Sequence, residues 1–438
     1  MTLMADAAAI ARIIAHAAAR GVTRVSFGCA DWNGRLRTTQ YPVEALGNAL
    51  REGLPVTTAI FAPDSAERPI AGGYFHDPAN GYRDAWLMPD AGAVRDDPYA
   101  AGAPGLLVLG DLGGAYADCC PRAVLGREVA ALAALGYRCD SAFEIEYHVL
   151  NETPASLREK VPAMLDRHAA LERMYSFVDQ AVAAPLMDAT HAAAAAFGIP
   201  VHSLHTEFSG LLFKCVAKIV ARRQGALATF MARLAEPFES AGAHLNLSLR
   251  ALANDAPVFH APDGRCSAAL LGFLGGLQRY TPALMLLQLP HLNSYKRYVG
   301  DSFAPRANAW GFDNKTCAWR VVNHTPALAR IECRVPGADV NPYLSLAGVL
   351  AAGRRGIEEA LAPSAPVDGD AAAAGAPQGA PWPPDLAAAI THWRASDFAR
   401  EIFGARFVDV YALTREWELA QLARTVTDWE LRQFGEGV

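Results

Sequence analysis

Two acidic side chains, Glu144 and Glu146, stand two residues apart in a stretch of strand-forming residues, Ser141–His148. Side chains two apart on a β-strand point to the same face, so the two carboxylates would lie together. Carboxylates held close repel each other unless a cation or a proton lies between them. The pair therefore indicates either a site for Mg²⁺ or Mn²⁺, which prefer oxygen ligands, or the solvated face of an edge strand.

Further polar groups alternate along other predicted strands or directly follow one. They are Glu207, His244, Asn246, Ser248, Glu332 and Arg334. His244, Asn246 and Ser248 share one face because the stretch 243–249 alternates strictly. Carboxylates and a histidine that converge from separate strands could form a two-metal site, which clamps a phosphoryl group during transfer.

Four arginines, Arg297, Arg320, Arg330 and Arg334, add fixed positive charge near the predicted strands. A guanidinium binds phosphate or carboxylate through two parallel hydrogen bonds. Each group also has a simpler interpretation: a structural histidine, surface charges, or an ion pair between Glu332 and Arg334. Composition and spacing leave both interpretations open.

The elements that must position these residues indicate an α+β protein in two parts. A helix at 6–20, a hairpin turning at Asn33-Gly34, a helix at 42–52 and strands near 82–90 and 105–109 predict a small domain, residues 1–112. Asn-Gly is the strongest short hairpin signal. The larger part, residues 113–438, would carry the candidate site.

In the larger part, helices and strands are intermixed. Helices are predicted at 121–135, 157–196, 211–223, 268–287, 341–360 and within 386–434. Strands are predicted at 141–148, 198–204, 243–249, 317–322 and 329–335. The proline-, alanine- and glycine-rich stretch 362–384 has no periodicity and predicts a mobile loop.

The composition narrows the function classes. The chain has 438 residues, 52% of them hydrophobic, and a net charge of −6, which gives no support to nucleic-acid binding. No apolar run is long enough to span a bilayer, and the N-terminus has no secretory signal. The eight cysteines form no CxxC pair. We expect a soluble cytoplasmic protein with free cysteines, without nucleic-acid or membrane partners.

Six segments occur together in an order typical of one known family. They are Phe143–Tyr147, His205–Glu207, Ala228–Met231, Gly242–Leu249, Asn293–Arg297 and Arg330–Leu344. In these segments, which extend over nearly the whole chain, the sequence resembles the glutamine synthetase superfamily. Thr414–Glu418 and Val426–Leu431 resemble the subgroup that contains lengsin and the bacterial γ-glutamyl-amide synthetases, including the γ-glutamylpolyamine type.

The resemblance implies an N-terminal β-grasp domain and a larger catalytic domain with a curved antiparallel sheet and flanking helices. It also implies a ring-shaped homo-oligomer, a dodecamer or similar, with active sites between neighbours. The implied chemistry is ATP-dependent: ATP phosphorylates the γ-carboxylate of glutamate, and ammonia or an amine then displaces phosphate. Such chemistry needs Mg²⁺ or Mn²⁺ at the triphosphate and arginines at the moving phosphoryl group.

By position, the resemblance implies a role for each candidate residue. The ligands of the nucleotide-side metal would be Glu144, His244 and Glu332, and those of the other metal Glu146 and Glu207. The catalytic arginines would be Arg297, Arg320 and Arg334, around glutamate and the transferred phosphate. The nucleotide contacts would be Ser248, Lys315 and Arg330.

The sequence also departs from the family pattern. A second glutamate that normally follows the one matching Glu207 has no counterpart, although Glu236 or Glu239 could supply a ligand. Asn246 replaces a histidine, and Lys315 replaces an arginine and cannot form its planar fork. Phe303 stands where an acidic residue faces ammonium, which favours an organic amine over ammonia. The alternative is a catalytically inactive family member that keeps the fold.

Overall fold

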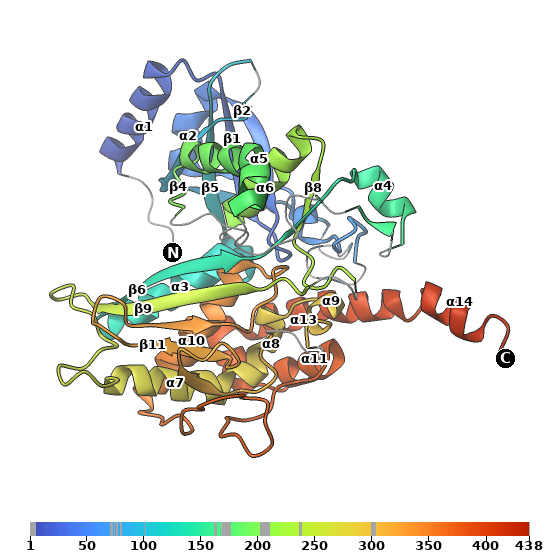
Figure 1. The fold of residues 1–438 in the computed structure, drawn as a ribbon. Coiled ribbons are helices and arrows are strands. Elements are labelled where there is room, and N and C mark those ends of the chain that lie inside the picture. Colours follow the sequence, from blue (N-terminus) through green and yellow to red (C-terminus); the bar gives the residue numbers. More distant parts are fainter. Residues whose placement is uncertain are drawn as a thin grey trace.

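Two larger sheets organise the molecule (Figure 1). The computed structural model describes residues 6–70, 73, 75, 78, 81–100, 102–161, 164–166, 168, 177–201, 211–235, 239–298 and 304–437. Among these residues, no helix is both long enough and apolar enough to cross a membrane.

The first sheet belongs to the N-terminal part. Its elements are α1 (Ala7–Ala19), β1 (Arg24–Ala30), β2 (Leu36–Pro42), η1 (Val43–Ala45), α2 (Leu46–Glu52), β3 (Leu54–Val56), η2 (Thr58–Phe61), β4 (Ala85–Asp97) and β5 (Gly105–Gly113). The strand order is β2-β1-β5-β4-β3. β1 pairs antiparallel with β2 and parallel with β5, and α1 and α2 pack against β4.

The predicted hairpin at Asn33-Gly34 is confirmed. One oxygen of the Asp31 side chain accepts hydrogen bonds from the backbone N–H groups of Asn33 and Arg35, at 3.0 and 2.8 Å. Gly34 has φ +70°, a conformation that glycine adopts without strain. The turn therefore fixes the β1–β2 register.

The second sheet carries the candidate site. Its strands are β6 (Tyr137–Ile145), β9 (Ala243–Ala251), β10 (Trp310–Phe312), β11 (Trp319–Val322) and β12 (Arg330–Cys333). The order is β10-β11-β12-β9-β6. The antiparallel arrangement that the resemblance implied is confirmed for β6, β9, β12 and β11, whereas β10 pairs parallel with β11.

The two faces of this sheet differ in chemistry. Leu245, Leu247 and Leu249 of β9 are at most 1% exposed and belong to one hydrophobic core with the helices behind the sheet. Those helices include α3 (Pro121–Ala134), α7 (Ala268–Tyr280) and α10 (Pro342–Glu358). His244, Asn246 and Ser248 take the alternate positions, so they lie on the opposite face.

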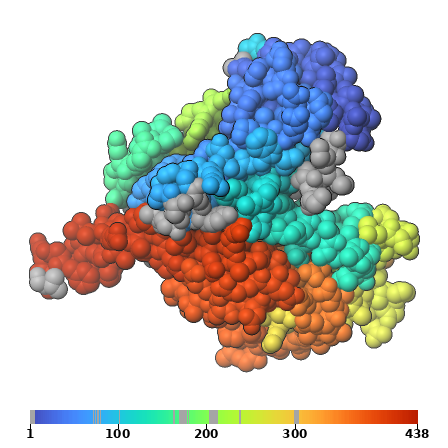
Figure 2. Space-filling model, turned by 180° about the vertical axis from the view of Figure 1, so that it is seen from behind, coloured from blue at the N-terminus to red at the C-terminus, as the bar shows by residue number. Residues whose placement is uncertain are grey.

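The remaining elements surround these layers. They are η4 (Gly114–Cys119), β7 (His148–Leu150), α4 (Pro154–Glu159), α5 (Phe177–Ala196), α6 (Leu211–Arg223), β8 (Leu227–Thr229), η7 (Thr281–Leu284), α8 (Met285–Gln288), α9 (Leu292–Tyr295), α11 (Leu386–Arg394), α12 (Asp397–Phe403), α13 (Ala405–Leu422) and α14 (Asp428–Phe434). α14 extends away from the body (Figures 1 and 2).

Two predicted helices are interrupted. The prediction of one helix over 157–196 is wrong, since α4 ends at Glu159 and Lys160 is extended. Pro162 follows in the sequence, and the residue before a proline is disfavoured in a helix. The helix predicted at 268–287 ends at Tyr280, just before Pro282, and continues as η7 and α8.

The stretch 362–384 is irregular, as predicted, but its described backbone is tied to the sheet edge. The N–H of Val367 donates to the carbonyl of Trp310 at 2.8 Å, and the Asn314 side chain donates to the carbonyls of Val367 and Gly369. These hydrogen bonds connect part of the stretch to the edge of the sheet, and its predicted mobility stays a prediction.

Candidate active site

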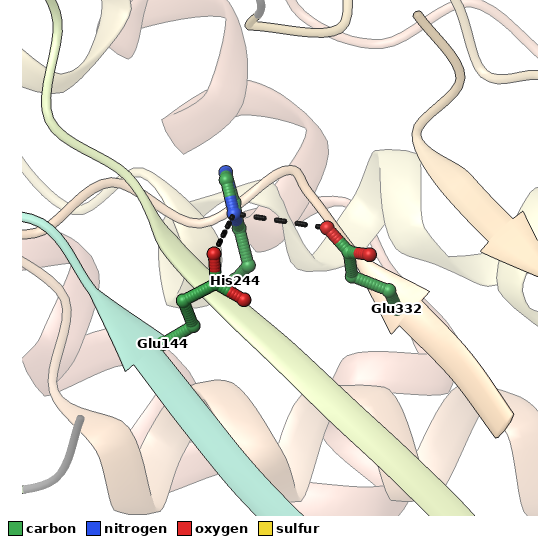
Figure 3. A group of neighbouring side chains, drawn as sticks. All are labelled: Glu144, His244 and Glu332. Atoms are coloured by element: carbon green, nitrogen blue, oxygen red, sulfur yellow. Dashed lines mark ion pairs between the residues drawn. The ribbon is translucent and has the colours of Figure 1, made fainter. Parts of the chain in front are cut away.

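Three side chains from three neighbouring strands converge on the polar face of the second sheet (Figure 3). Glu144 of β6 lies opposite His244 of β9, and Glu332 of β12 lies opposite Asn246 of β9. Opposed residues in antiparallel strands share a face, which explains the convergence. The Nδ1 atom of His244 is 3.7 Å from Oε1 of Glu144 and 3.7 Å from Oε1 of Glu332.

This cluster fits a divalent cation. His244 is 5% exposed, and its Nδ1 atom is buried without a hydrogen-bond partner among the described residues. The potential ligand atoms of Glu144, His244 and Glu332 all lie within 4.8 Å of one another. A buried polar atom without a partner is costly. A cation between one imidazole nitrogen and two carboxylates would remove that cost, and oxygen-rich sites of this kind suit Mg²⁺ or Mn²⁺.

Glu146 lies just beyond the end of β6 and approaches the other side of the imidazole. Its Oε1 atom is 3.9 Å from Nε2 of His244. Its Oε2 atom accepts the backbone N–H of Gly242 at 2.5 Å, and its own N–H donates to the carbonyl of Gly242 at 2.8 Å. Glu144 and Glu146 therefore approach different nitrogens of His244.

Gly242 allows this crowding because it has no side chain. A Cβ atom there would lie 2.8 Å from Nη2 of Arg297 and 3.0 Å from Nε2 of His244. Arg297 is 2% exposed, and its Nη1 donates to the carbonyls of Val335 and Pro336 at 2.9 and 2.8 Å. Burial lowers the pKa of Arg297, opposed by the charge of Glu146. The guanidinium nevertheless stays protonated, because its pKa starts so high.

Two predicted catalytic arginines pair with one carboxylate. Arg320 donates to Oε2 of Glu332 at 2.7 Å, and Arg334 donates to Oε1 at 2.5 Å. Burial raises the pKa of Glu332, but the charges of Arg334 and His244 and the hydrogen bond from Arg320 outweigh it and lower the pKa overall. Glu332 is therefore an anion at neutral pH, the form that a cation site requires.

Two of the predicted nucleotide contacts, Ser248 and Arg330, lie further along the polar face. Ser248 is opposite Asp140, and Arg330 donates to the side chain of Asn246 at 3.1 Å. Lys315 is exposed in the turn between β10 and β11. Within the part of the chain that the structure describes, no hydrogen bond or ion pair joins Lys315 to Glu144, His244 or Glu332.

Some sequence predictions fall elsewhere. Glu207, Glu236 and Phe303 lie outside the described residues, so the second predicted cation site is described only at Glu146. Glu239 is exposed. The roles assigned to individual residues therefore stay predictions.

Sequence reasoning missed two residues that shape the site. Gly242 stands between two alanines just before β9, a run of small residues that signals close packing. Asp313 follows β10, and its side chain pairs with Arg320 at 3.0 Å. Asp313-Asn314 is a common turn pair, but turn chemistry alone does not reveal which arginine an aspartate will face.

Comparisons with known proteins indicate the family of this chain. The model of the glutamine synthetase catalytic domain matches residues 118–210 and 209–434. The glutamate–isopropylamine ligase of a Pseudomonas species is 29% identical over 94% of this chain and 95% of its own length. The γ-glutamylethanolamide synthetase of Streptomyces coelicolor is 32% identical over 96% of this chain and 94% of its own length. The γ-glutamylputrescine synthetase of Escherichia coli is 27% identical, over 92% and 89%.

Solved structures share the fold. The ligand-free structure of GmaS superposes with a TM-score of 0.80 at 21% identity and covers 97% of this chain and 99% of that one. Its ADP complex gives a TM-score of 0.81 at 20% identity, covering 99% of both chains. The predicted α+β class is thus confirmed. Because the family model matches most of its length, the chain belongs to the glutamine synthetase family.

Proposed function

We propose that this protein is an ATP-dependent ligase that joins the γ-carboxylate of glutamate to an organic amine in preference to ammonia. The relatives named above act on isopropylamine, form an ethanolamide, or use putrescine. Similarity over nearly the whole chain supports the same reaction class here and counts against an inactive family member.

The observation that carries the proposal is the buried Nδ1 atom of His244, which faces two carboxylates from neighbouring strands without a hydrogen-bond partner in the described chain. Glu144, His244 and Glu332 would hold one Mg²⁺ or Mn²⁺ ion. Glu146 and Glu207 would hold a second, weaker one. When bound, these cations neutralise the negative charge of the ATP phosphates.

The arginines would bind the anionic substrate groups. Arg320 and Arg334 lie beside the cation site and present planar donors, which suit the phosphoryl group in transfer and the carboxylates of glutamate. Arg297, fixed by two backbone carbonyls, would supply a buried positive charge near Glu146. Ser248, Arg330 and Lys315 would contact the nucleotide.

Two steps then account for the chemistry. A γ-carboxylate oxygen of glutamate attacks the terminal phosphorus of ATP, the bond to the bridging oxygen breaks, and ADP leaves. The amine nitrogen attacks the resulting acyl phosphate, the carbon–oxygen bond breaks, inorganic phosphate leaves, and the nitrogen loses a proton. The chain's contribution is to orient both substrates and to stabilise the charge that moves between them.

The wider organisation is also proposed. Residues 1–112 would form the N-terminal domain and residues 113–438 the catalytic domain, with the boundary at the end of β5. The family resemblance supports a ring-shaped homo-oligomer, a dodecamer or similar. The eight free cysteines support a reducing, cytoplasmic location.

ADP release from the purified protein tests the proposal. We expect release that requires glutamate, an amine, and Mg²⁺ or Mn²⁺, and the amine panel contains isopropylamine, ethanolamine, putrescine and ammonia. Mass spectrometry should detect the matching γ-glutamyl amide. No glutamate-dependent ADP with any amine, at any metal concentration, would overturn the ligase proposal in favour of an inactive family member.

Calorimetric titration with Mn²⁺ tests the cation sites separately. We expect two binding events. His244→Ala should remove the tighter one, because it deletes the nitrogen ligand of the site formed with Glu144 and Glu332. His392→Ala is the matched control, because His392 is exposed on α11, away from the cluster. Unchanged Mn²⁺ binding in the His244 variant would contradict the assigned ligands.

A further inference from the structure

Asp313 forms ion pairs both with Arg320 of the proposed active site and with His324 at the protein surface. Its Oδ1 atom is 3.0 Å from Nη2 of Arg320, and its Oδ2 atom is 2.7 Å from Nε2 of His324. Arg320 in turn donates to Glu332 at 2.7 Å. The exposed fraction of the side chains falls along this series, from 65% at His324 through 40% and 20% to 4% at Glu332.

The backbone holds Asp313 in an unusual but fixed conformation. Its φ is +48°, a left-handed value that side chains other than those of asparagine and aspartate adopt rarely. Its N–H donates to the carbonyl of Val321 at 3.0 Å. The carboxylate therefore approaches Arg320 from a turn that is bonded to the same strand, β11, that carries Arg320.

The irregular stretch 362–384 supports this turn from outside. Asn314 donates to the carbonyls of Val367 and Gly369 at 3.0 and 2.7 Å. The hydroxyl of Thr316 accepts the N–H of Ala371 at 3.0 Å. The turn is thus bonded both to β11 and to this outer stretch, so the position of Asp313 does not depend on its ion pairs alone.

The guanidinium of Arg320 is shared between two carboxylates. Nη1 faces Glu332 and Nη2 faces Asp313. Glu332 already pairs with Arg334 through Oε1, the oxygen that faces His244, and with Arg320 through Oε2. A cation at Oε1 would be a third positive partner and would weaken the attraction between Glu332 and Arg320. Asp313 would then keep the guanidinium plane in place while Glu332 acts as a ligand.

We infer that Asp313 is a positioning residue for Arg320, and that His324 is the outer partner of the same series. The inference rests on the ligase function proposed above and extends it to a residue outside the cation cluster. The Asp313–His324 pair is partly exposed, and exposed ion pairs contribute little to the stability of the fold. Replacing Asp313 should therefore change the position of the Arg320 guanidinium more than it changes the stability of the fold.

Asp313→Asn tests the inference because it keeps the size and removes the charge. We expect kcat for ADP formation to fall about 10- to 100-fold, since small displacements of a positioning group cost that much, while the KM for the amine and Mn²⁺ binding stay unchanged. Asp313→Glu should restore part of kcat. His324→Gln should lower kcat less than about threefold, because its pair with Asp313 is the most exposed link. Asp409→Asn is the control, because Asp409 of α13 pairs with Arg400 of α12, away from the Asp313 series.

A crystal structure of Asp313→Asn supplies a readout that does not depend on activity. We expect the Arg320 guanidinium to rotate away from its present place. An unmoved Arg320, or a kcat within twofold of the wild-type value, would overturn the inference. If the wild-type protein itself releases no ADP, the ligase proposal fails, and the crystal structure still decides whether Asp313 holds Arg320.

Discussion

On β9, Leu245, Leu247 and Leu249 are at most 1% exposed, whereas Asn246 and Ser248 between them are partly exposed. One strand thus supplies both the hydrophobic core and the candidate site. The apolar face packs against α7 and α10, whereas the polar face carries Glu144, His244 and Glu332, with Arg320 and Arg334 paired to Glu332. Because side chains alternate between the two faces of a strand, one face can form the hydrophobic core while the other forms the candidate site.

The comparison shows where stability and function are located. Burying a leucine side chain stabilises the fold by about 1.5–3 kcal/mol. Burying Glu332 between Arg320 and Arg334 adds much less, because desolvation of three charges offsets most of their attraction. We therefore expect the polar face to contribute to binding more than to stability. Variants on the two faces should separate activity from stability.

Glu332→Gln should have the largest effect on activity. The substitution keeps the shape but removes the negative charge that a cation and two arginines share. We expect kcat/KM for ADP formation to fall about 1000-fold, the upper range for the loss of one electrostatic stabiliser. Glu358→Gln is the control, since Glu358 pairs with Arg354 on α10, away from the site. A Glu332 variant with more than a tenth of wild-type activity would show that the polar face is not the catalytic face.

Leu247→Ala tests the opposite face. The cavity left by a buried leucine typically costs about 2–5 kcal/mol of unfolding free energy. We expect thermal unfolding several degrees below wild type, with kcat per folded molecule within about threefold of wild type. Leu252→Ala, at a residue that is 52% exposed, should change neither quantity measurably. A loss of kcat in Leu247→Ala as large as in Glu332→Gln would mean that the faces are not separable.

Alternation explains why much of the fold and part of the site could be predicted. The pattern in 243–249 placed His244, Asn246 and Ser248 on one face, and the structure has them there. Other features depend on pairing between distant segments. The parallel pairing of β10 with β11 involves only a few residues, and such a short strand carries little periodic signal.

The detailed contacts of the site were beyond sequence reasoning for a similar reason. Glu332 could have formed a simple pair with Arg334, and it does, but Arg320 joins it from another strand. Which charges meet across a sheet depends on register, and register is fixed by the whole fold. The resemblance to a known family supplied the candidate roles of these residues, whereas spacing alone left the alternatives open.

Gly242→Ala should reduce activity less than Glu332→Gln does, and it sharpens the comparison at the edge of the polar face. A Cβ atom would press on Arg297 and His244, and Arg297 cannot move freely because two carbonyls hold it. We expect kcat/KM to fall about 10- to 100-fold, since displacements under 1 Å at a catalytic group have that consequence.

Gly126→Ala is the matched control, because Gly126 lies in α3 with nothing within 4 Å of the new Cβ atom. That variant should gain about 1 kcal/mol of stability through helix propensity and keep its activity. If Gly242→Ala keeps full activity, the polar face tolerates movement of Arg297, and the site depends on charge more than on position.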